Sequence, residues 1–277
     1  MRKPILLLGE YDVGKSHFGG QLLGRLREAK GALRMTSAPA TLAPFDGVLV
    51  RLNQGKAAGH TGAANYRESF WQVADAEGRT MDLVWPDYGG EQVTSLRNDR
   101  RMSPDWRKRV ETSTGWVVMI RIHNSHVPDD IFSRPLHSIG ERPAAPKGFV
   151  MSDQAKLVDF LQWLAFVRGT GTLERITEPR LILLLSCWDE LPQDEIGNRP
   201  WDVLRLRMPM VAAYLEANWE PGALHVLGLS ALERALSEDT VDEEYVDRGP
   251  ESFGYMVQPD GTRDKDLTLA ITPLLRA

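Results

Sequence analysis

The stretch "GEYDVGKS" at positions 9–16 decides the fold, and it follows directly on the apolar run "PILLL" at positions 4–8. Two glycines five positions apart, followed by Lys and Ser, form the pattern of a loop whose backbone N–H groups wrap a phosphate. Apolar residues recur at helical spacing from Lys15 to Lys30, so a helix is expected there. The sequence therefore predicts a phosphate-binding loop between a strand and a helix, where the helix dipole favours an anion.

Seven residues of this stretch are the expected contacts of the phosphates: Gly9, Asp12, Val13, Gly14, Lys15, Ser16 and His17. Lys15 is expected to reach the β- and γ-phosphates, and its charge makes it a candidate catalytic residue. Ser16 is expected to place its hydroxyl on Mg²⁺. The alternative is an ordinary glycine-rich turn, and the strand and the helix on either side argue against it.

Composition and charge narrow the class of protein. The 277 residues carry a net charge of −5 with both signs interspersed, which offers no broad basic surface for nucleic acid or for an anionic membrane. The single cysteine, Cys187, excludes an internal disulfide framework and is typical of a reducing compartment. No stretch approaches the roughly 20 apolar residues of a membrane span. We therefore expect a cytoplasmic protein with neither a membrane span nor a nucleic-acid partner.

Strand-like and helix-like segments alternate along the chain, which indicates an α/β architecture. Strands are expected at 4–8, 115–122, 180–187 and 223–231, and "RESFWQVADA" (67–76) with "TMDLVWPD" (80–87) predicts a hairpin. Helices are expected at 15–30, 153–168 and 200–217. The predicted fold is a P-loop NTPase three-layer sandwich, in which a mixed six-stranded sheet carries helices on both faces.

Two stretches interrupt this alternation and are expected to be insertions, namely residues 31–60 and the Pro-rich residues 123–150. The nucleotide-binding domain is therefore expected to cover residues 1–235. Residues 236–277 are expected to form a C-terminal extension that packs on it.

A second phosphate-binding signal lies in "DLVWPDYGGE", where an apolar strand ends at Asp87 and Gly90 follows three positions later. An acidic residue at the carboxyl end of a strand is well placed to bind the water shell of Mg²⁺. The backbone N–H of Gly90 is expected to bind a γ-phosphate and to release it after hydrolysis. This arrangement predicts a sensor of the nucleotide state, whereas a strand that ends in a Gly-Gly turn is the alternative.

These motifs, together with "LLSCWDEL" and "LGLSAL", occur in the order found in Ras-like, translation-factor-related P-loop GTPases, which the chain resembles over residues 3–235. The resemblance implies GTP or GDP as the ligand and Mg²⁺ as the cofactor. It implies that Asp189 reads the guanine edge and that Ser230 and Ala231 support the base. Cys187 stands where the family has a Lys whose aliphatic stem covers the base. Trp188 either stacks on the base in its place or belongs to the core.

The resemblance also implies a Thr that completes the Mg²⁺ shell and contacts the γ-phosphate. Thr61 in "AAGHTGAANYRE" matches best, and Thr36 and Thr41 remain candidates. The segment from Gly31 to His60 is longer than in small GTPases. In this respect the chain resembles the double-GTPase-type proteins of bacterial conflict and defence systems.

The residue after the sensor motif bears on hydrolysis, because the family commonly places a Gln there to orient water. This chain has Glu91, which is expected to position or partly deprotonate the attacking water. A carboxylate beside the γ-phosphate is also repulsive, so slow hydrolysis is expected. The basic run "RNDRRMSPDWRKR" (97–109) is either a surface for a protein partner or a solvated helix face.

These features predict a Mg²⁺-dependent switch that binds GTP, hydrolyses it slowly and signals to an effector or activator protein. One alternative is a nucleotide-binding adaptor with little hydrolysis. Another is an ATPase or nucleotide kinase, which the missing base-loop Lys favours and which Asp189 and the Ser230-Ala231 pair oppose.

Overall fold

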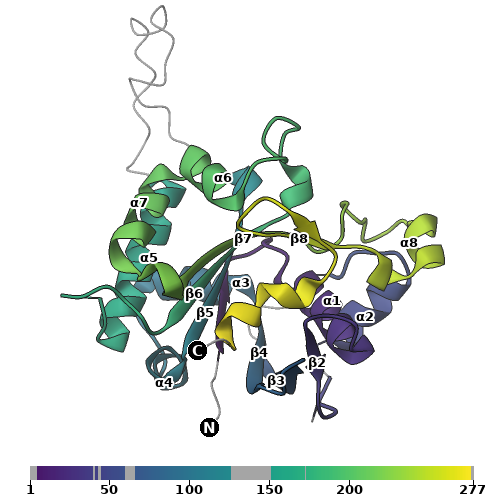
Figure 1. Cartoon of the computed structure of the whole chain (residues 1–277), viewed down its shortest axis with the longest axis horizontal. Coiled ribbons are helices and arrows are strands. Elements are labelled where there is room, and N and C mark those ends of the chain that lie inside the picture. The colour runs from purple at the N-terminus through teal and green to yellow at the C-terminus, as the bar shows by residue number, and fades with distance from the viewer. Residues whose placement is uncertain are drawn as a thin grey trace, which may run out of the picture.

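The computed structural model describes residues 5–39, 41–42, 45–59, 66–125, 151–171 and 173–275. Its main sheet has six strands in the order β1-β5-β6-β7-β8-β9 (Figure 1). The first four run parallel and are β1 (Ile5–Gly9), β5 (Gly115–Arg121), β6 (Arg180–Ser186) and β7 (Leu224–Ser230). The antiparallel edge consists of β8 (Tyr255–Val257) and β9 (Arg263–Asp264). The expected mixed six-stranded sheet is therefore confirmed.

Two strands of this sheet are not the expected ones. The hairpin strands β3 (Tyr66–Asp75) and β4 (Thr80–Tyr88) pair with each other and, together with β2 (Leu33–Met35), form a separate three-stranded sheet. The main sheet instead gains its fifth and sixth strands, β8 and β9, at the edge next to β7. These strands are three and two residues long, which is too short for a recognisable alternation of apolar and polar residues.

The main sheet is covered on both faces, because alternate residues of its strands point to opposite sides. On β6, Leu181, Leu183 and Leu185 belong to one buried cluster and Ile182 and Leu184 to another. The first cluster includes residues of α3 (Gly90–Asp99), α4 (Pro104–Thr112), α5 (Asp153–Arg168), α6 (Pro200–Arg207) and α7 (Pro209–Asn218). The second includes residues of α1 (Lys15–Glu28), of the second sheet, and of the 3₁₀ helices Leu267–Ala270 and Thr272–Leu274. Figure 1 shows α4, α5 and α7 to the left of the strands and α1 to their right.

The expected helices differ from the structure mainly where a proline interrupts them. Helix α5 has the predicted bounds; the hydroxyl of Ser152 accepts from the Ala155 N–H at its start, and Gly169 ends it in the left-handed conformation. The predicted helix 200–217 is instead two helices, because Pro209 lacks an N–H group and cannot continue α6. Helix α1 ends at Glu28, before the predicted Lys30.

The segments outside the regular alternation contain further elements. Residues 31–60 include β2 and α2 (Asp46–Asn53), and the C-terminal residues include α8 (Glu243–Arg248) together with β8 and β9. Short 3₁₀ helices lie at Ile122–Asn124, Trp188–Glu190, Pro221–Ala223 and Pro250–Ser252. Most of the second predicted insertion, residues 126–150, lies outside the described residues. The domain boundary at residue 235 stays a prediction.

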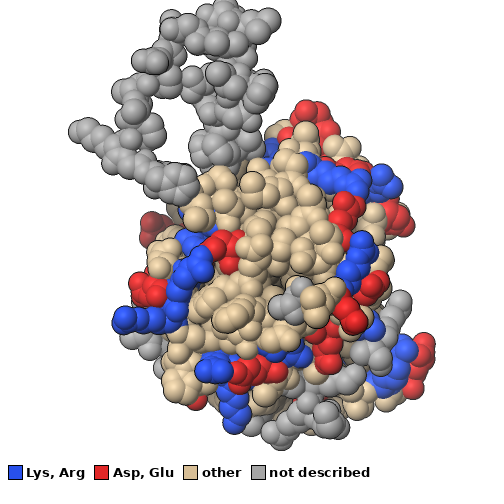
Figure 2. Space-filling view, turned by 90° about the vertical axis from the view of Figure 1, so that its left-hand side faces the viewer, with Lys and Arg blue, Asp and Glu red and all other residues tan. Residues whose placement is uncertain are grey.

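The charges on the surface are mixed. Figure 2 shows the left-hand side of the view in Figure 1, where basic and acidic side chains are interspersed around an uncharged centre. This pattern agrees with the small net charge of −5. Among the described residues, no helix is both long and apolar enough to cross a membrane.

Candidate functional site

The loop between β1 and α1 is curled rather than extended. Asp12 and Gly14 have positive φ angles of 61° and 79°, so the chain turns twice before α1 begins at Lys15. Within the described part of the chain, the N–H groups of Asp12, Val13 and Gly14 donate to no protein acceptor. Consecutive amides of this kind, next to a helix N-terminus, form a concave site for an anion.

Lys15 bends back over this loop. Its Nζ donates to the carbonyl oxygens of Gly9, at 2.8 Å, and Glu10, at 2.7 Å, and lies 5.4 Å from the centre of the Tyr88 ring. The Tyr88 hydroxyl is buried and donates to the Leu7 carbonyl at 2.8 Å, and this burial raises the pKa of Tyr88 above its usual range. The ammonium group is therefore held by two carbonyl oxygens of the loop, beside a neutral aromatic ring.

The sensor motif touches the phosphate loop at Gly90. A Cβ atom at this position would lie 2.3 Å from the Tyr11 nitrogen and 2.5 Å from the Glu10 carbonyl carbon. Only glycine permits this approach, because both neighbours are backbone atoms that cannot move aside independently. The motif at the end of β4 and the loop after β1 are thus in direct contact, although about 80 residues separate them along the chain.

Of the three residues expected to bind Mg²⁺, the structure describes the side chain of only one, Ser16. Ser16 lines a cavity next to the loop, described below. Asp87 lies near the end of β4, and its side chain is not described; Thr61 lies outside the described residues. The alternatives Thr36 and Thr41 do not line the cavity, and Thr36 instead donates to the Gln72 side chain at 2.9 Å.

The chain just before Thr61 is attached to the site. The Nε2 atom of His17 accepts from the Ala58 N–H at 2.9 Å, which ties the segment after α2 to the first turn of α1. The Ala57 N–H donates to the Ser237 carbonyl at 2.8 Å, so the same segment is also bound to the C-terminal part of the chain. Residues 57–59 line the cavity.

Glu91 is exposed in the first turn of α3 and does not line the cavity. The basic run that follows takes part in ion pairs within the chain. Arg97 pairs with Glu10, and Arg100 pairs with Asp159. Arg109 Nε lies 2.8 Å from Glu68 Oε1. These three arginines therefore fix α3 and α4 to neighbouring elements.

At the other end of the cavity, Asp189 and Ser230 are brought together from the ends of β6 and β7. The Ser230 hydroxyl donates to Asp189 Oδ1 at 2.5 Å, and its oxygen accepts from the Glu233 N–H at 3.0 Å. One carboxylate oxygen of Asp189 is thereby oriented by a neutral donor. Ala231 lies beside it in the cavity wall.

The two residues between Ser186 and Asp189 have different environments. Trp188 is fully buried, and its Nε1 donates to the Ile196 carbonyl at 3.1 Å, so it belongs to the core and does not stack on a ligand. Cys187 lines the cavity in a left-handed conformation with a φ angle of 52°. Burial raises the pKa of its thiol to about 12, so this group stays neutral at physiological pH.

A single cavity of about 380 Å³ joins the two ends. It is lined by predicted residues from both, namely Asp12, Val13, Gly14, Lys15, Ser16, His17, Gly90, Asp189 and Ala231. Gly9 lies behind the loop, where a Cβ would meet the Val13 side chain at 2.7 Å. The cavity therefore has the loop amides in one part of its wall and the Asp189 carboxylate in another, which suits a ligand that combines phosphates with a donor-rich ring.

Two arginines in the cavity wall were not predicted from the sequence, Arg121 and Arg234. Arg121 ends β5 and pairs with Glu190 and Asp12. The hydrogen bonds to Glu190 raise the pKa of Arg121 above its usual range. A signal for Arg121 did exist, because a charged residue that ends a buried parallel strand lies at the edge where ligands bind.

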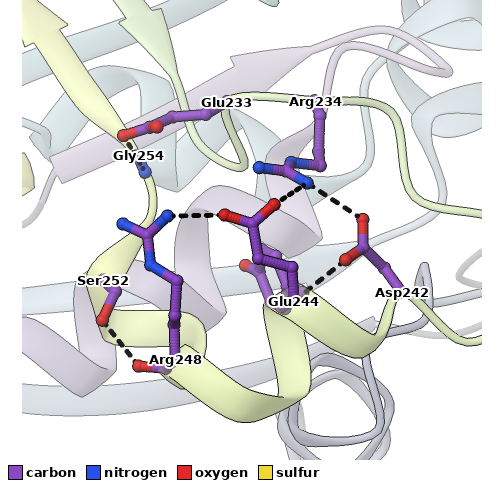
Figure 3. Close-up of polar contacts among 8 residues, drawn as sticks. Glu233, Arg234, Asp242, Glu244, Arg248, Ser252 and Gly254 are labelled. Atoms are coloured by element: carbon purple, nitrogen blue, oxygen red, sulfur yellow. Dashed lines mark hydrogen bonds and ion pairs between the residues drawn. The ribbon is translucent and has the colours of Figure 1, made fainter.

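Arg234 belongs to an ion-pair network that fixes the wall of the cavity after Ser230 (Figure 3). Its Nη1 donates to Glu244 Oε2 at 2.9 Å and lies 3.3 Å from Asp242 Oδ2. Arg248 donates to the other oxygen of Glu244 at 2.7 Å, and these bonds hold the pKa of Glu244 below its usual range. The Phe253 ring contacts both guanidinium groups, at 5.0 Å and 4.6 Å from its centre. The C-terminal part of the chain therefore braces this wall.

A family model described as Double-GTPase 1 matches residues 6–274 of the chain. A search of curated proteins found no match. Among solved structures, the chain is similar to the Arl6 BBS3 small GTPase of Trypanosoma brucei with bound GppNp, at 8% identity and a TM-score of 0.40, over 91% of this chain and 99% of that one. It is similar to the GTP-bound Ski7 GTPase-like domain of S. cerevisiae, at 12% identity and a TM-score of 0.42, over 83% of this chain and 43% of that one. It is also similar to the bacterial selenocysteine-specific elongation factor EF-Sec, at 11% identity and a TM-score of 0.37, over 83% of this chain and 26% of that one.

Proposed function

This chain belongs to the Double-GTPase 1 family, and we propose that it is a Mg²⁺-dependent switch that binds GTP, hydrolyses it slowly and signals its nucleotide state to a protein partner. One observation carries the proposal. One cavity is lined both by residues 12–14 and by Asp189, whose carboxylate accepts from the buried Ser230 hydroxyl. Its two ends match the two chemically different ends of a guanine nucleotide.

The phosphate end supplies charge and donors for the triphosphate. Lys15 and the loop amides would bind the β- and γ-phosphates, and in a cavity they act with little competition from water. At the base end, the Asp189 carboxylate accepts hydrogen bonds, so it suits a ring edge that presents two neighbouring N–H groups. Guanine presents such an edge, whereas the corresponding edge of adenine includes an acceptor.

Mg²⁺ is the expected cofactor, and the Ser16 hydroxyl in the cavity wall is an oxygen donor of the kind that it binds. Among the described residues, no group of three or more His, Cys, Asp or Glu side chains is placed to hold a metal. We propose that Mg²⁺ is bound chiefly by phosphate oxygens and water, with the Ser16 hydroxyl as a ligand and with Asp87 and Thr61 as further ligands. When bound there, Mg²⁺ would neutralise charge on the phosphate oxygens.

The switch role is supported by the contact of Gly90 with the phosphate loop. Because Gly90 lies against the backbone of Glu10 and Tyr11, a γ-phosphate in the loop would alter the position of α3. The His17–Ala58 hydrogen bond would link the segment before Thr61 to the same phosphate. We propose that a protein effector or activator recognises these two segments and that the protein acts in the cytoplasm.

A nucleotide-binding adaptor with little hydrolysis is the second candidate function. It is favoured by the position of Glu91, which is exposed and outside the cavity. In the switch, Glu91 would have to move inward with the γ-phosphate in order to position water. In the adaptor, binding alone would recruit the partner.

Two measurements on the full chain test these functions. A fluorescent GTP analogue is bound in the presence of Mg²⁺ and displaced with unlabelled GTP or ATP. The proposal expects GTP to displace it at much lower concentration than ATP, and equal displacement would contradict guanine recognition. Single-turnover hydrolysis of labelled GTP then separates the switch, which converts the bound GTP slowly, from the adaptor, which leaves it intact.

A further inference from the structure

The wall of the cavity between the phosphate end and the base end needs a residue that the base loop does not supply. The first residues after β6 are short or buried, because Cys187 ends in a neutral thiol and Trp188 is part of the core. A purine ring placed between the phosphate loop and Asp189 would require a flat or aliphatic surface beside it. That surface has to come from another element.

Arg121 is placed to provide it. It is the last residue of β5, and β5 lies between β1 and β6 in the sheet. Arg121 is paired with Ser186, the last residue of β6. Its side chain is 24% exposed and lines the cavity. The residue therefore lies between the loop that follows β1 and the loop that follows β6.

Both loops hold the guanidinium group. Arg121 Nε donates to Glu190 Oε2 at 2.8 Å, and Nη2 donates to the other oxygen of the same carboxylate. Arg121 Nη1 donates to the Asp12 carboxylate and lies 3.4 Å from the Asp12 carbonyl oxygen. A guanidinium held at three nitrogen atoms keeps a fixed plane, which a Lys side chain would not.

We propose that Arg121 is a nucleotide-binding residue that clamps the phosphate loop to the base loop and lays its guanidinium plane against the purine ring. This inference rests on the proposed function. Guanidinium groups stack favourably on aromatic rings, and an arginine already held by two carboxylates loses little freedom on doing so. The same group also neutralises the Asp12 carboxylate, which would otherwise repel the phosphates.

The test is the rate at which a fluorescent GDP analogue leaves the full-length protein in Mg²⁺. Arg121→Ala is expected to raise this rate about 10-fold or more, because it removes the stacking surface, the clamp and the neutralising charge together. Arg207→Ala is the matched control. Arg207 also forms a two-bond pair with a carboxylate, that of Glu195, at 2.6 Å and 2.9 Å, and its side chain is 16% exposed, but it lies outside the cavity. The rate of GDP release from Arg207→Ala is expected to equal that of the wild type.

A rescue variant distinguishes binding from support of the fold. Cys187→Lys in the Arg121→Ala background places a long cationic side chain at the same wall and is expected to restore slower release. If circular dichroism shows that Arg121→Ala is unfolded, Glu190→Gln is tested in its place. This variant is expected to raise the rate of GDP release severalfold, because the Arg121 guanidinium loses a charged partner and is held less firmly.

The outcomes separate this inference from the proposed function. Wild-type protein that binds no guanine nucleotide overturns the function itself. Wild-type protein that binds GDP, together with an Arg121→Ala variant that releases it at the wild-type rate, overturns only the role of Arg121. Equal acceleration in Arg207→Ala likewise rejects a specific clamp. No rescue by Cys187→Lys rejects the role of this wall as a surface for the purine ring.

Discussion

The two ends of the cavity are built in different ways. The phosphate end comes from one continuous stretch, residues 9–16, and it uses backbone amides and one Lys. The base end is assembled from β5, β6 and β7 and is braced by the C-terminal residues, and it uses side-chain carboxylates and arginines. A site made of local backbone leaves a continuous pattern in the sequence, whereas a site made of distant side chains leaves only short motifs for some of its residues.

The largest expected effect is at the phosphate end. Lys15→Ala should lower the affinity for GTP by about 3 kcal/mol, or roughly 100-fold, because it removes a charge from a closed phosphate site. Titration of a fluorescent GTP analogue measures this loss. Lys30→Ala is the control, since the Lys30 side chain is 82% exposed and lies outside the cavity. An affinity within twofold of the wild type in Lys15→Ala would remove the loop from nucleotide binding.

The corresponding variant at the base end should have a smaller and more selective effect. Asp189→Asn should lower the affinity for GTP by about 2 kcal/mol, because it replaces an acceptor of two hydrogen bonds by a mixed donor and acceptor. The affinity of Asp189→Asn for tripolyphosphate, measured by competition with a fluorescent GTP analogue, should equal that of the wild type. The control is Asp194→Asn, an exposed position, and its affinity for GTP should also be unchanged. A loss of tripolyphosphate binding equal to that of GTP would show that the two ends are not separate.

A third variant tests the contact between the sensor motif and the phosphate loop. Gly90→Ala should destabilise the protein by about 1 to 3 kcal/mol and weaken GTP binding, since its Cβ would lie 2.3 Å from the Tyr11 nitrogen. Gly24→Ala in α1 has open space around its Cβ and should be neutral or stabilising by up to about 1 kcal/mol. For each variant, the melting temperature without GTP reports the stability, and its rise on addition of GTP reports the binding. A fully stable Gly90→Ala variant that binds GTP normally would argue against the contact.

The smallest effect is expected at Glu91. Glu91→Ala should leave GTP affinity unchanged and slow single-turnover hydrolysis about 10-fold, which is below the usual contribution of a well-placed general base because the residue starts outside the cavity. Asp105→Ala is the control, since Asp105 is also an exposed acid in the first turn of a helix. Unchanged hydrolysis in Glu91→Ala would remove Glu91 from the catalytic role.

Most of the architecture could be predicted because it follows from local periodicity. The buried strands β1, β5, β6 and β7 are continuous apolar runs, and α5 has caps at both ends that the sequence displays. The predictions were wrong where a single residue or a distant pairing decided the result. Pro209 split a helix, and the hairpin joined β2 instead of the main sheet.

The candidate site could be predicted only where its residues lie in short motifs. The resemblance also located Asp189 and Ser230, which are 41 residues apart, because their motifs follow strands in a known order. The resemblance did not identify the ion-pair partners of Arg121, which are 69 and 109 residues away along the chain. Nothing in the sequence near Arg121 indicates which carboxylates it meets.

By itself, the sequence determined the phosphate loop, the alternation of strands and helices, and the order of the nucleotide-binding motifs. These features depend on backbone conformation and on the spacing of apolar residues, which are properties of neighbouring positions. Only the tertiary structure decided that Gly90 lies on the phosphate loop and that Arg121 joins Asp12 to Glu190. Such contacts depend on which strands lie side by side in the sheet, and strand order is set by the packing of the whole chain.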